Sequence, residues 1–359
     1  MLKRLKLTNF KGHRSSELWF DRLSLLVGEN ASGKSSVLLA LELLSSQAQG
    51  LPPMVGVNRF ERLVHKSGAW RPEEIHLRAV LSEVEAGLVA GAGYWFPLAT
   101  RPTRPQVRRG HSEGCSIDPG MQFVAELAVL QPVVGLLRTP SYTRDLIPKV
   151  GRDGANTASV VAEIQRARDG RYEALLNDLR VVVPAVVSVE AVPAHVDEQV
   201  TEQRQLDGRD VRVSYAHPVK GERLQFEFRG GVQTDAHGAS EGTLIALAIL
   251  AAVHGEAPPK LLLIDDIDRG LHPRAQVELV EVLKRLLDQR PELQIIATTH
   301  SPYLVDAVEA SSVHVCAVDQ DGVCHVRRLT EHPDAKEALE SLTPGEFLSA
   351  EGEAWVVGG

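Results

Sequence analysis

The chain has 359 residues, of which 43% are hydrophobic, an ordinary share for a globular protein and ample for a core. Its net charge of −8 argues against a protein whose whole surface wraps nucleic acid, but it leaves room for one local basic face. The three cysteines (Cys115, Cys316 and Cys324) lack zinc-site spacing and are too few for a disulfide framework, so we expect a reducing, cytoplasmic location.

Neither the start of the chain nor its most apolar stretch predicts a membrane segment. Residues 1–7 alternate charge and leucine as a strand does, without a signal-peptide core. The most apolar run, Leu244–Val253, is about half the length that a bilayer requires. We therefore expect no membrane partner.

The first fifty residues predict two or three strands followed by a glycine-rich loop and a helix. Leu23–Val27 is an apolar run typical of a buried strand, and Ser35–Leu44 is typical of a helix with most of its surface buried. Between them, Gly28–Ser35 has the pattern G-x-x-x-x-G-K-S. A strand, this loop and a helix together form the setting that a phosphate-binding loop needs.

In such a loop the backbone N–H groups converge on phosphate oxygens at the N terminus of a helix, where the helix dipole favours anions. Lys34 supplies a positive charge to the β- and γ-phosphates, and the Ser35 hydroxyl is a ligand for Mg²⁺. The alternative is a chance glycine-rich turn before a helix. The predicted nucleotide-binding residues are Gly28, Asn30, Ser32, Gly33, Lys34, Ser35 and Ser36.

The middle of the chain changes character. Repeated prolines and the absence of a long heptad pattern predict an irregular, β-containing insertion over residues 51–150. Residues 153–157 predict a turn in which Asn156 or Thr157 caps the next helix. The elements predicted after it are helices over about 158–169 and 172–179 and a strand-rich stretch over 181–228, in which 211–215 and 224–228 alternate as half-exposed strands.

Alternating strands and helices return after Ser240. The predicted order is a helix over 242–254, a strand over 260–265, a helix over 273–289 and a strand over 294–298. This β-α-β unit implies parallel strands. A hairpin around 320–322, a short helix and a tail follow. We predict an α/β P-loop NTPase fold, with residues 1–50 and 235–330 as the core, 51–234 as an inserted lobe and 331–359 as a C-terminal helix and tail.

Two carboxylates follow the strand Leu261–Ile264. Because the carboxyl ends of parallel strands face the ligand crevice, we expect Asp265 to reach the Mg²⁺ that Ser35 holds. Asp266 then lies near the γ-phosphate, where a carboxylate orients or deprotonates the attacking water. The alternative is an acidic turn after a buried strand.

Two further segments have both a functional and a plain structural interpretation. His300 ends the next strand at the same sheet edge, where it either hydrogen-bonds the γ-phosphate or the attacking water, or only caps the strand. Ser240 and Gly242 open a helix, where they either form a second phosphate site or serve as an N-cap.

Taken in order, five segments resemble the ABC-type ATPase heads of the SMC/RecF class. They are Gly28–Ser35, Ser240–Thr243, Leu261–Asp266, Gly270–Pro273 and His300. The resemblance is most specific to stand-alone AAA-type ATPases related to the overcoming-lysogenization-defect nucleases. It covers about residues 1–50 and 235–310, whereas residues 50–145 match no pattern that we recognise.

The resemblance implies a head-to-head homodimer that sandwiches two ATP molecules with Mg²⁺. Lys34, Asp266 and His300 would act catalytically on the nucleotide of their own subunit, while Ser240 and Gly242 would close over the partner's γ-phosphate. The chain departs from the family in three ways. Asp266 stands where glutamate is usual, the signature is Ser-Glu-Gly, and Gln122 and Gln131 are unconvincing candidates for the lobe-linking glutamine.

The expected function is an ATP-driven dimeric switch that senses or clamps nucleic acid and controls a separate effector, a nuclease or toxin, in phage defence or DNA repair. The chain lacks the long coiled coil of SMC proteins. It ends about fifty residues after His300, too early for a nuclease domain, and Glu346, Glu351 and Glu353 are interpreted as a solvated tail.

The nucleic-acid surface has two candidates. The first consists of Arg101, Arg104, Arg108 and Arg109, which equally suit a solvated loop. The second consists of Lys3, Lys6, Lys11 and Arg14. Two other functions remain open, namely a weakly hydrolysing nucleotide-dependent scaffold that recruits a protein and, less favoured, a transporter ATPase subunit.

Overall fold

The computed structural model describes residues 1–49, 74–81, 93–99, 126–206 and 209–358. The chain divides into two compact units, each of which is described by itself. The first unit comprises Met1–Val129, Pro259–Asp268 and Gln276–Gly359. The second comprises Leu130–Pro258 and Arg269–Ala275.

The first unit contains a four-stranded antiparallel sheet in the order β2-β1-β4-β5. Its strands are β1 (Leu2–Phe10), β2 (His13–Trp19), β4 (Glu74–Leu81) and β5 (Gly93–Ala99). In β1, Leu5 and Leu7 are buried while Lys6 between them is exposed, as the alternating sequence predicts. Strands β4 and β5 come from the part of the sequence that we interpreted as an inserted lobe.

A six-stranded sheet carries the strands that end at the predicted site, in the order β13-β12-β3-β11-β10-β6. These strands are β3 (Leu23–Val27), β6 (Leu127–Leu130), β10 (Leu261–Ile264), β11 (Gln294–Thr299), β12 (Val313–Val318) and β13 (Cys324–Arg328). β11 is parallel to both β10 and β3, and β12 is parallel to β3. The predicted β-α-β unit is confirmed, with α8 (Pro273–Gln289) between β10 and β11.

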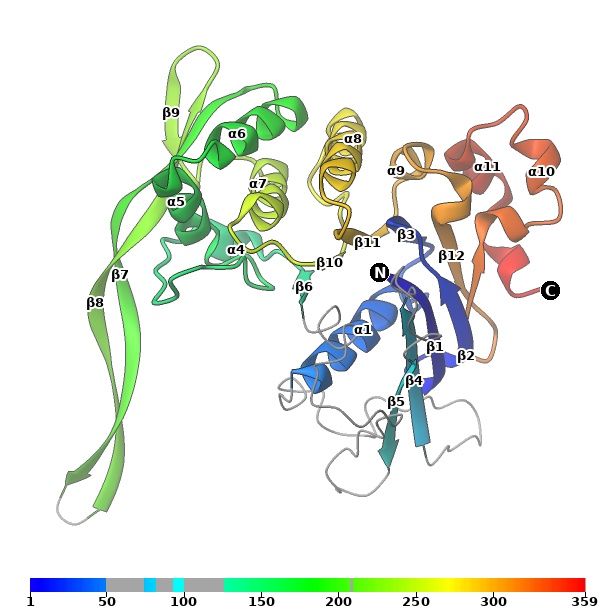
Figure 1. Cartoon of the computed structure of the whole chain (residues 1–359), viewed down its shortest axis with the longest axis horizontal. Helices are drawn as coiled ribbons and strands as arrows, with labels where there is room; N and C mark the ends of the chain where they lie inside the picture. Colours follow the sequence, from blue (N-terminus) through cyan, green and yellow to red (C-terminus); the bar gives the residue numbers. More distant parts are fainter. Residues whose placement is uncertain (50–73, 82–92, 100–125, 207–208, 359) are drawn as a thin grey trace, which may run out of the picture. The chain divides into compact units, whose positions relative to one another are not determined.

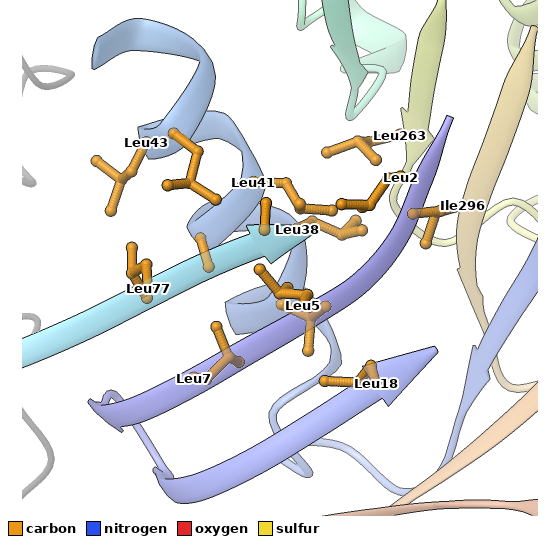
Figure 2. Close-up of a cluster of buried hydrophobic side chains, with 14 of the residues drawn as sticks. Leu2, Leu5, Leu7, Leu18, Leu38, Leu41, Leu43, Leu77, Leu263 and Ile296 are labelled. Atoms are coloured by element: carbon orange, nitrogen blue, oxygen red, sulfur yellow. The ribbon is translucent and has the colours of Figure 1, made fainter. Parts of the chain in front are cut away.

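The main core of the first unit is built around helix α1 (Lys34–Ala48), which follows β3. Figure 2 shows Leu38, Leu41 and Leu43 of α1 facing leucines of β1 and β4, with Leu263 and Ile296 of the six-stranded sheet beside them. The helix is apolar around most of its circumference because it packs against strands of both sheets. Burying a leucine side chain stabilises the fold by roughly 1.5–3 kcal/mol, so this cluster fixes where the N terminus of α1 lies.

The second unit has a helical core of α4 (Val134–Leu137), α5 (Thr157–Ala167), α6 (Arg171–Val182) and α7 (Glu241–His254). Every residue of α7 from Gly242 to His254 is buried. Neighbouring helices therefore cover the apolar run that is too short to cross a bilayer. His254 at the end of α7 pairs with buried Asp178 of α6, with Nε2 2.8 Å from Oδ2.

A long antiparallel ribbon extends from the helices of the second unit (Figure 1). It consists of β7 (Val186–Leu206) and β8 (Arg209–Phe228), and β9 (Val232–Asp235) pairs with the base of β8. The strands predicted at 211–215 and 224–228 are confirmed, and both belong to the single strand β8. Lys220 and Gly221, between the two predicted strands, continue the pairing without a turn.

Two predicted local features differ in the structure. Asn156 stands at the N-cap of α5, but its side chain makes no capping bond, because its Oδ1 accepts from the backbone of Gly151. Glu346 is exposed, as predicted, but it lies in a helix and not in an irregular tail. Together with Thr343 it forms a capping box at the start of α11 (Pro344–Glu351), in which each side chain bonds the other's backbone N–H.

The remaining C-terminal elements are short. They are α9 (Pro302–Asp306), α10 (Ala335–Ala338) and the 3₁₀ turns η1 (Ala310–Ser312), η2 (Leu329–Glu331) and η3 (Ala354–Val356). The predicted hairpin around residues 320–322 is confirmed as the β12–β13 turn, with Gly322 at a φ of 77°. Among the residues that the structure describes, we find no helix with the length and apolarity to cross a membrane.

Candidate functional site

The glycine-rich loop lies between the end of β3 and the start of α1, in the first unit. Lys34 is buried, and its Nζ donates to the backbone carbonyls of Gly28 and Glu29, at 2.7 Å each. The pKa of the Lys34 ammonium is below its ordinary value because the group is buried. The charges of Cys316, Asp266 and other acidic groups offset only part of this effect. The loop thus holds a cation in a partly desolvated position, where its attraction for phosphate is less screened than in water.

The loop glycines are required by what lies against them. Gly28 has a φ of 140°, and a Cβ at this position would lie 2.1 Å from the carbonyl oxygen of Cys316 in β12. Gly33 has a φ of 96°, and its Cβ would lie 2.8 Å from both the Cys324 sulfur and the His13 ring. Only glycine fits both the backbone conformation and the space, so strands β12 and β13 shape the back of the loop.

Ser35 and Asp265 come together although they are far apart in the sequence. The Ser35 hydroxyl donates to Oδ1 of Asp265 at 3.0 Å. The hydroxyl of Thr298 at the end of β11 donates to the same oxygen at 2.7 Å. Three elements, α1, β10 and β11, therefore converge at the carboxyl edge of the parallel strands, as expected for a ligand crevice in an α/β sheet.

These two side chains fit a magnesium ion. Mg²⁺ prefers oxygen ligands and takes only one or two of them from the protein, with phosphates and water supplying the others. A hydroxyl and a carboxylate within hydrogen-bond distance of each other at the N terminus of α1 form such a set. Ser35 and Asp265 would hold the ion, which would neutralise charge on the β- and γ-phosphates.

Asp266 follows with an unusual backbone. Its φ of 53° lies in the left-handed region, and its N–H donates to the Thr298 hydroxyl at 2.8 Å. Burial raises the pKa of its carboxyl group, and repulsion from Asp265 and Asp268 raises it further. A raised pKa makes the carboxylate a better proton acceptor at neutral pH.

His300 is exposed directly after β11, and its electrostatic effect offsets part of the rise in the pKa of Asp266. The backbone N–H of His300 donates to Oδ1 of Asp268 at 3.4 Å, and the Thr299 hydroxyl donates to that oxygen at 2.7 Å. Asp268 thus fixes the chain at the end of β11. The arrangement leaves Asp266 as the carboxylate suited to activate water.

Ser240 and Gly242 belong to the second unit. Ser240 is the N-cap of α7, and its Oγ accepts from the Thr243 N–H at 3.2 Å. Gly242 packs against the segment after β10, since a Cβ at Gly242 would lie 2.3 Å from the carbonyl oxygen of Gly270. The capping interpretation of Ser240 is therefore confirmed, and capping leaves a phosphate-binding role open because both use the first turn of the helix.

The remaining predicted residues of the loop, and Gln131, make the following contacts. Asn30 is exposed, and the Ser32 hydroxyl lies 3.4 Å from Lys34 Nζ. The Ser36 N–H donates to the Gly33 carbonyl within the first turn of α1. Gln131 accepts from the Arg152 side chain at 3.1 Å.

The candidate nucleic-acid residues divide between described and undescribed parts of the chain. The arginines of the first candidate surface (Arg101, Arg104, Arg108 and Arg109) lie outside the described residues, as does Gln122. In the second candidate, Lys3, Lys6 and Arg14 are exposed, whereas Lys11 is half-buried. Lys6 faces Glu17 across the β1–β2 pair, and Glu17 also binds Arg4, so a carboxylate interrupts this basic face.

Sequence reasoning missed two residues that support the site. Thr298 bonds both the Asp265 carboxylate and the Asp266 backbone. Its position at the end of a predicted strand, close to His300, could have indicated this role from the sequence. His13 is fully buried between the Ser16 hydroxyl, 2.9 Å from Nδ1, and the Gly33 carbonyl, 3.2 Å from Nε2. No sequence signal pointed to His13, because its partners become neighbours only in the folded chain.

Two family models match the chain, one at each part of the predicted ATPase core. An AAA ATPase domain model matches residues 1–71. An AAA domain model, whose description names the AbiEii toxin and type IV toxin–antitoxin systems, matches residues 138–306. The two matches include the phosphate-binding loop, the signature segment and the carboxylates after β10.

One curated protein is similar to part of this chain. The Septu protein PtuA of Bacillus thuringiensis is 36% identical over 88 residues, which is 24% of this chain and 21% of that protein. The match thus spans about a fifth of the relative's length.

The solved structures share the fold. An SMC head bound to the C-terminal winged-helix domain of ScpA has a TM-score of 0.61 at 14% identity, over 93% of this chain and 99% of that one. The SMC head domain from Thermotoga maritima has a TM-score of 0.51 at 15% identity, over 91% and 98%. Residues 1–71 and 138–306 thus match AAA-domain family models, and the chain has the fold of an SMC head.

Proposed function

We propose that this chain binds ATP with Mg²⁺ at the Gly28–Ser35 loop and hydrolyses it. The observation that carries the proposal is the 3.0 Å contact between the Ser35 hydroxyl and Asp265, which joins the glycine-rich loop to the carboxylate that we propose as a metal ligand. Lys34 would bind the β- and γ-phosphates and the first turn of α1 would accept their charge. Mg²⁺ would be held by Ser35 and Asp265.

Hydrolysis requires a group that orients and deprotonates water opposite the γ-phosphate. Asp266 is suited to this role by its raised pKa and its place next to Asp265. His300 would hydrogen-bond the attacking water or the γ-phosphate. Aspartate is one methylene shorter than the usual glutamate, so we expect slow turnover.

We further propose that ATP closes two copies of the chain into a head-to-head dimer. Ser240 and Gly242 of each copy would contact the γ-phosphate bound to the other copy. Hydrolysis would remove this phosphate and with it the contact that joins the two copies. Such a dimer would act as a switch that controls a separate effector protein, a nuclease or toxin. The proposed setting is phage defence or DNA repair.

The test is the mass of the purified protein without nucleotide and with ADP, ATP or a non-hydrolysable ATP analogue. We expect ATP and the analogue to produce a dimer that Asp266→Asn prolongs. Ser240→Arg should abolish the dimer while leaving ATP binding by the monomer intact, and Lys34→Ala should abolish both. A mass that stays unchanged in all four conditions would refute the switch.

A second candidate function is a nucleotide-dependent scaffold that barely hydrolyses ATP and recruits a protein. The short Asp266 side chain on a left-handed backbone favours it. The two candidates differ in turnover, since the scaffold predicts stoichiometric ATP binding without phosphate release. DNA binding that weakens steeply with salt would favour the switch, with Arg101, Arg104, Arg108 and Arg109 as the proposed contacts.

A further inference from the structure

The signature segment of the second unit carries an ion pair. Arg269 Nε donates to Oε1 of Glu241 at 2.7 Å, and the side chains are 51% and 38% exposed. Glu241 is the first residue of α7 and stands between Ser240 and Gly242. Arg269 directly precedes Gly270, the residue that packs against Gly242.

The backbone geometry holds this pair in place. Gly270 has a φ of 69°, and a Cβ there would lie 2.8 Å from Cγ of Glu241 and 3.0 Å from the N of Gly242. Residues 269–271 therefore lie directly against the first turn of α7. The close packing of Gly270 against Glu241 and Gly242 keeps the neighbouring guanidinium of Arg269 within reach of Glu241.

The charge of Glu241 conflicts with an anion at the same place. A carboxylate in the first turn of a helix interacts favourably with the helix dipole, but it repels a second anion that approaches the same N–H groups. In the proposed dimer, that second anion is the partner's triphosphate. A like-charge contact at an interface is unfavourable unless it is neutralised.

We propose that Arg269 neutralises Glu241 and thereby allows the N terminus of α7 to accept the triphosphate held by a second copy of this chain. This inference rests on the proposed function, because it concerns the same dimer. Arg269 is a positioning and charge-balancing residue in it, and Ser240 and Gly242 make the contact. The pair also explains how a Ser-Glu-Gly signature is compatible with ATP-driven closure.

The test measures the dimer dissociation constant with ATP in the Asp266→Asn background, where hydrolysis is slow. We expect Arg269→Gln to raise that constant by at least about tenfold, which corresponds to about 1.4 kcal/mol. Glu241→Gln should not weaken the dimer, and the double variant Glu241→Gln/Arg269→Gln should return to within about threefold of the parent. Arg269→Lys, which keeps the charge, should stay near the parent.

Three controls separate this role from a structural one. Arg229→Gln removes one exposed arginine of the same unit and should leave the dimer unchanged. Binding of ATP by the Arg269→Gln monomer should equal that of the parent, because the loop lies in the other unit. The defect of Arg269→Gln should shrink as salt rises from 0.05 to about 0.5 M, since salt screens exposed charges.

The outcomes distinguish failure of this inference from failure of the proposed function. If the parent dimerises with ATP and Arg269→Gln dimerises equally well, the inference is overturned while the proposed function stands. A double variant as weak as Arg269→Gln would also overturn it, since neutralisation would not be what Arg269 supplies. If the parent does not dimerise with ATP, the proposed function fails, and this inference fails with it.

Discussion

At the scale of single residues, the proposed catalytic carboxylate is also a source of instability. The pKa of Asp266 is raised above its ordinary value of 3.8 by burial and by Asp265 and Asp268. A carboxyl group whose folded pKa is raised destabilises the fold above that pKa. The destabilisation disappears as pH falls through the raised value and protonates the group.

Asp266→Asn should therefore stabilise the protein while removing hydrolysis. Asparagine keeps the shape and tolerates the left-handed backbone. Because the side chain is partly exposed, we expect a gain of less than about 1 kcal/mol at pH 7.5. The gain should vanish as pH falls toward 4. Denaturant unfolding across this pH range checks it, and a variant less stable than the parent at pH 7.5 would contradict it.

The two described cysteines should be inert in the folded protein. Burial raises the pKa of Cys316 to about 12 and that of Cys324 to about 11. Thiolate is the reactive form, and at pH 8 these pKa values leave at least about a hundredfold less of it than an ordinary thiol has. In a Cys115→Ser background, iodoacetamide should label neither residue until denaturant is added. Rapid labelling of the native protein would show that β12 and β13 open readily.

At the scale of elements, one buried glutamine links the two sheets of the first unit. The Gln294 side chain, at the start of β11, accepts from the Leu2 N–H at 2.8 Å. It also donates to the Leu2 carbonyl at 2.8 Å and to the Asp21 carbonyl at 2.9 Å. The bonds hold β1 at the start of β11, opposite the edge that carries the site.

Gln294→Leu should leave these backbone groups buried without partners. An unsatisfied buried polar group costs about 1–3 kcal/mol, so we expect a loss of at least about 2 kcal/mol in the free energy of unfolding. Gln233→Leu, at an exposed position of β9, is the matched control and should change it by less than about 0.5 kcal/mol. Equal effects of the two substitutions would show that the bonds of Gln294 are unimportant.

The ribbon of β7 and β8 should contribute little to stability beyond its base. Ser141 bridges to Glu222 toward the base of the ribbon, and Arg144 binds Glu198 past the middle of β7. Farther out, Val200 faces Tyr215 in the register. A two-stranded ribbon by itself is marginally stable, so we expect its outer part to add little to the stability of the fold.

Replacing residues 201–214 by Asn-Gly, which joins Val200 to Tyr215 through a tight turn, should therefore change the free energy of unfolding by less than about 1 kcal/mol. ATP binding should also be unaffected, because the loop lies in the other unit. Calorimetry and nucleotide titration check this. A loss of several kcal/mol would show that the outer ribbon supports the fold.

At the scale of the whole molecule, ATP should stabilise the folded chain by mass action. A ligand at a hundred times its dissociation constant adds about 2.7 kcal/mol, which corresponds to a Tm rise of roughly 5–10 °C for a unit of this size. Because the chain has two compact units, we expect the rise in the transition of the unit that contains the loop. Lys34→Ala should remove it, and an equal rise in that variant would place ATP elsewhere.

The sequence by itself determined the elements whose patterns are local. The strand Leu23–Val27, the loop with its helix, and the strand before Asp265 follow from apolar runs, glycines and helix-start signals within about ten residues of one another. The phosphate loop and the paired carboxylates were therefore evident from the sequence. Their order, with the signature segment, also indicated the ATPase class.

Only the tertiary structure decided which distant residues meet. It brought Ser35 to Asp265 across 230 positions, and it revealed Thr298 and His13 as supports of the site. It also joined the stretches 211–215 and 224–228 into one strand, because pairing with β7 continues through the residues between them. Local patterns record the preference of a segment, whereas register and contact depend on the free energy of the whole packed chain.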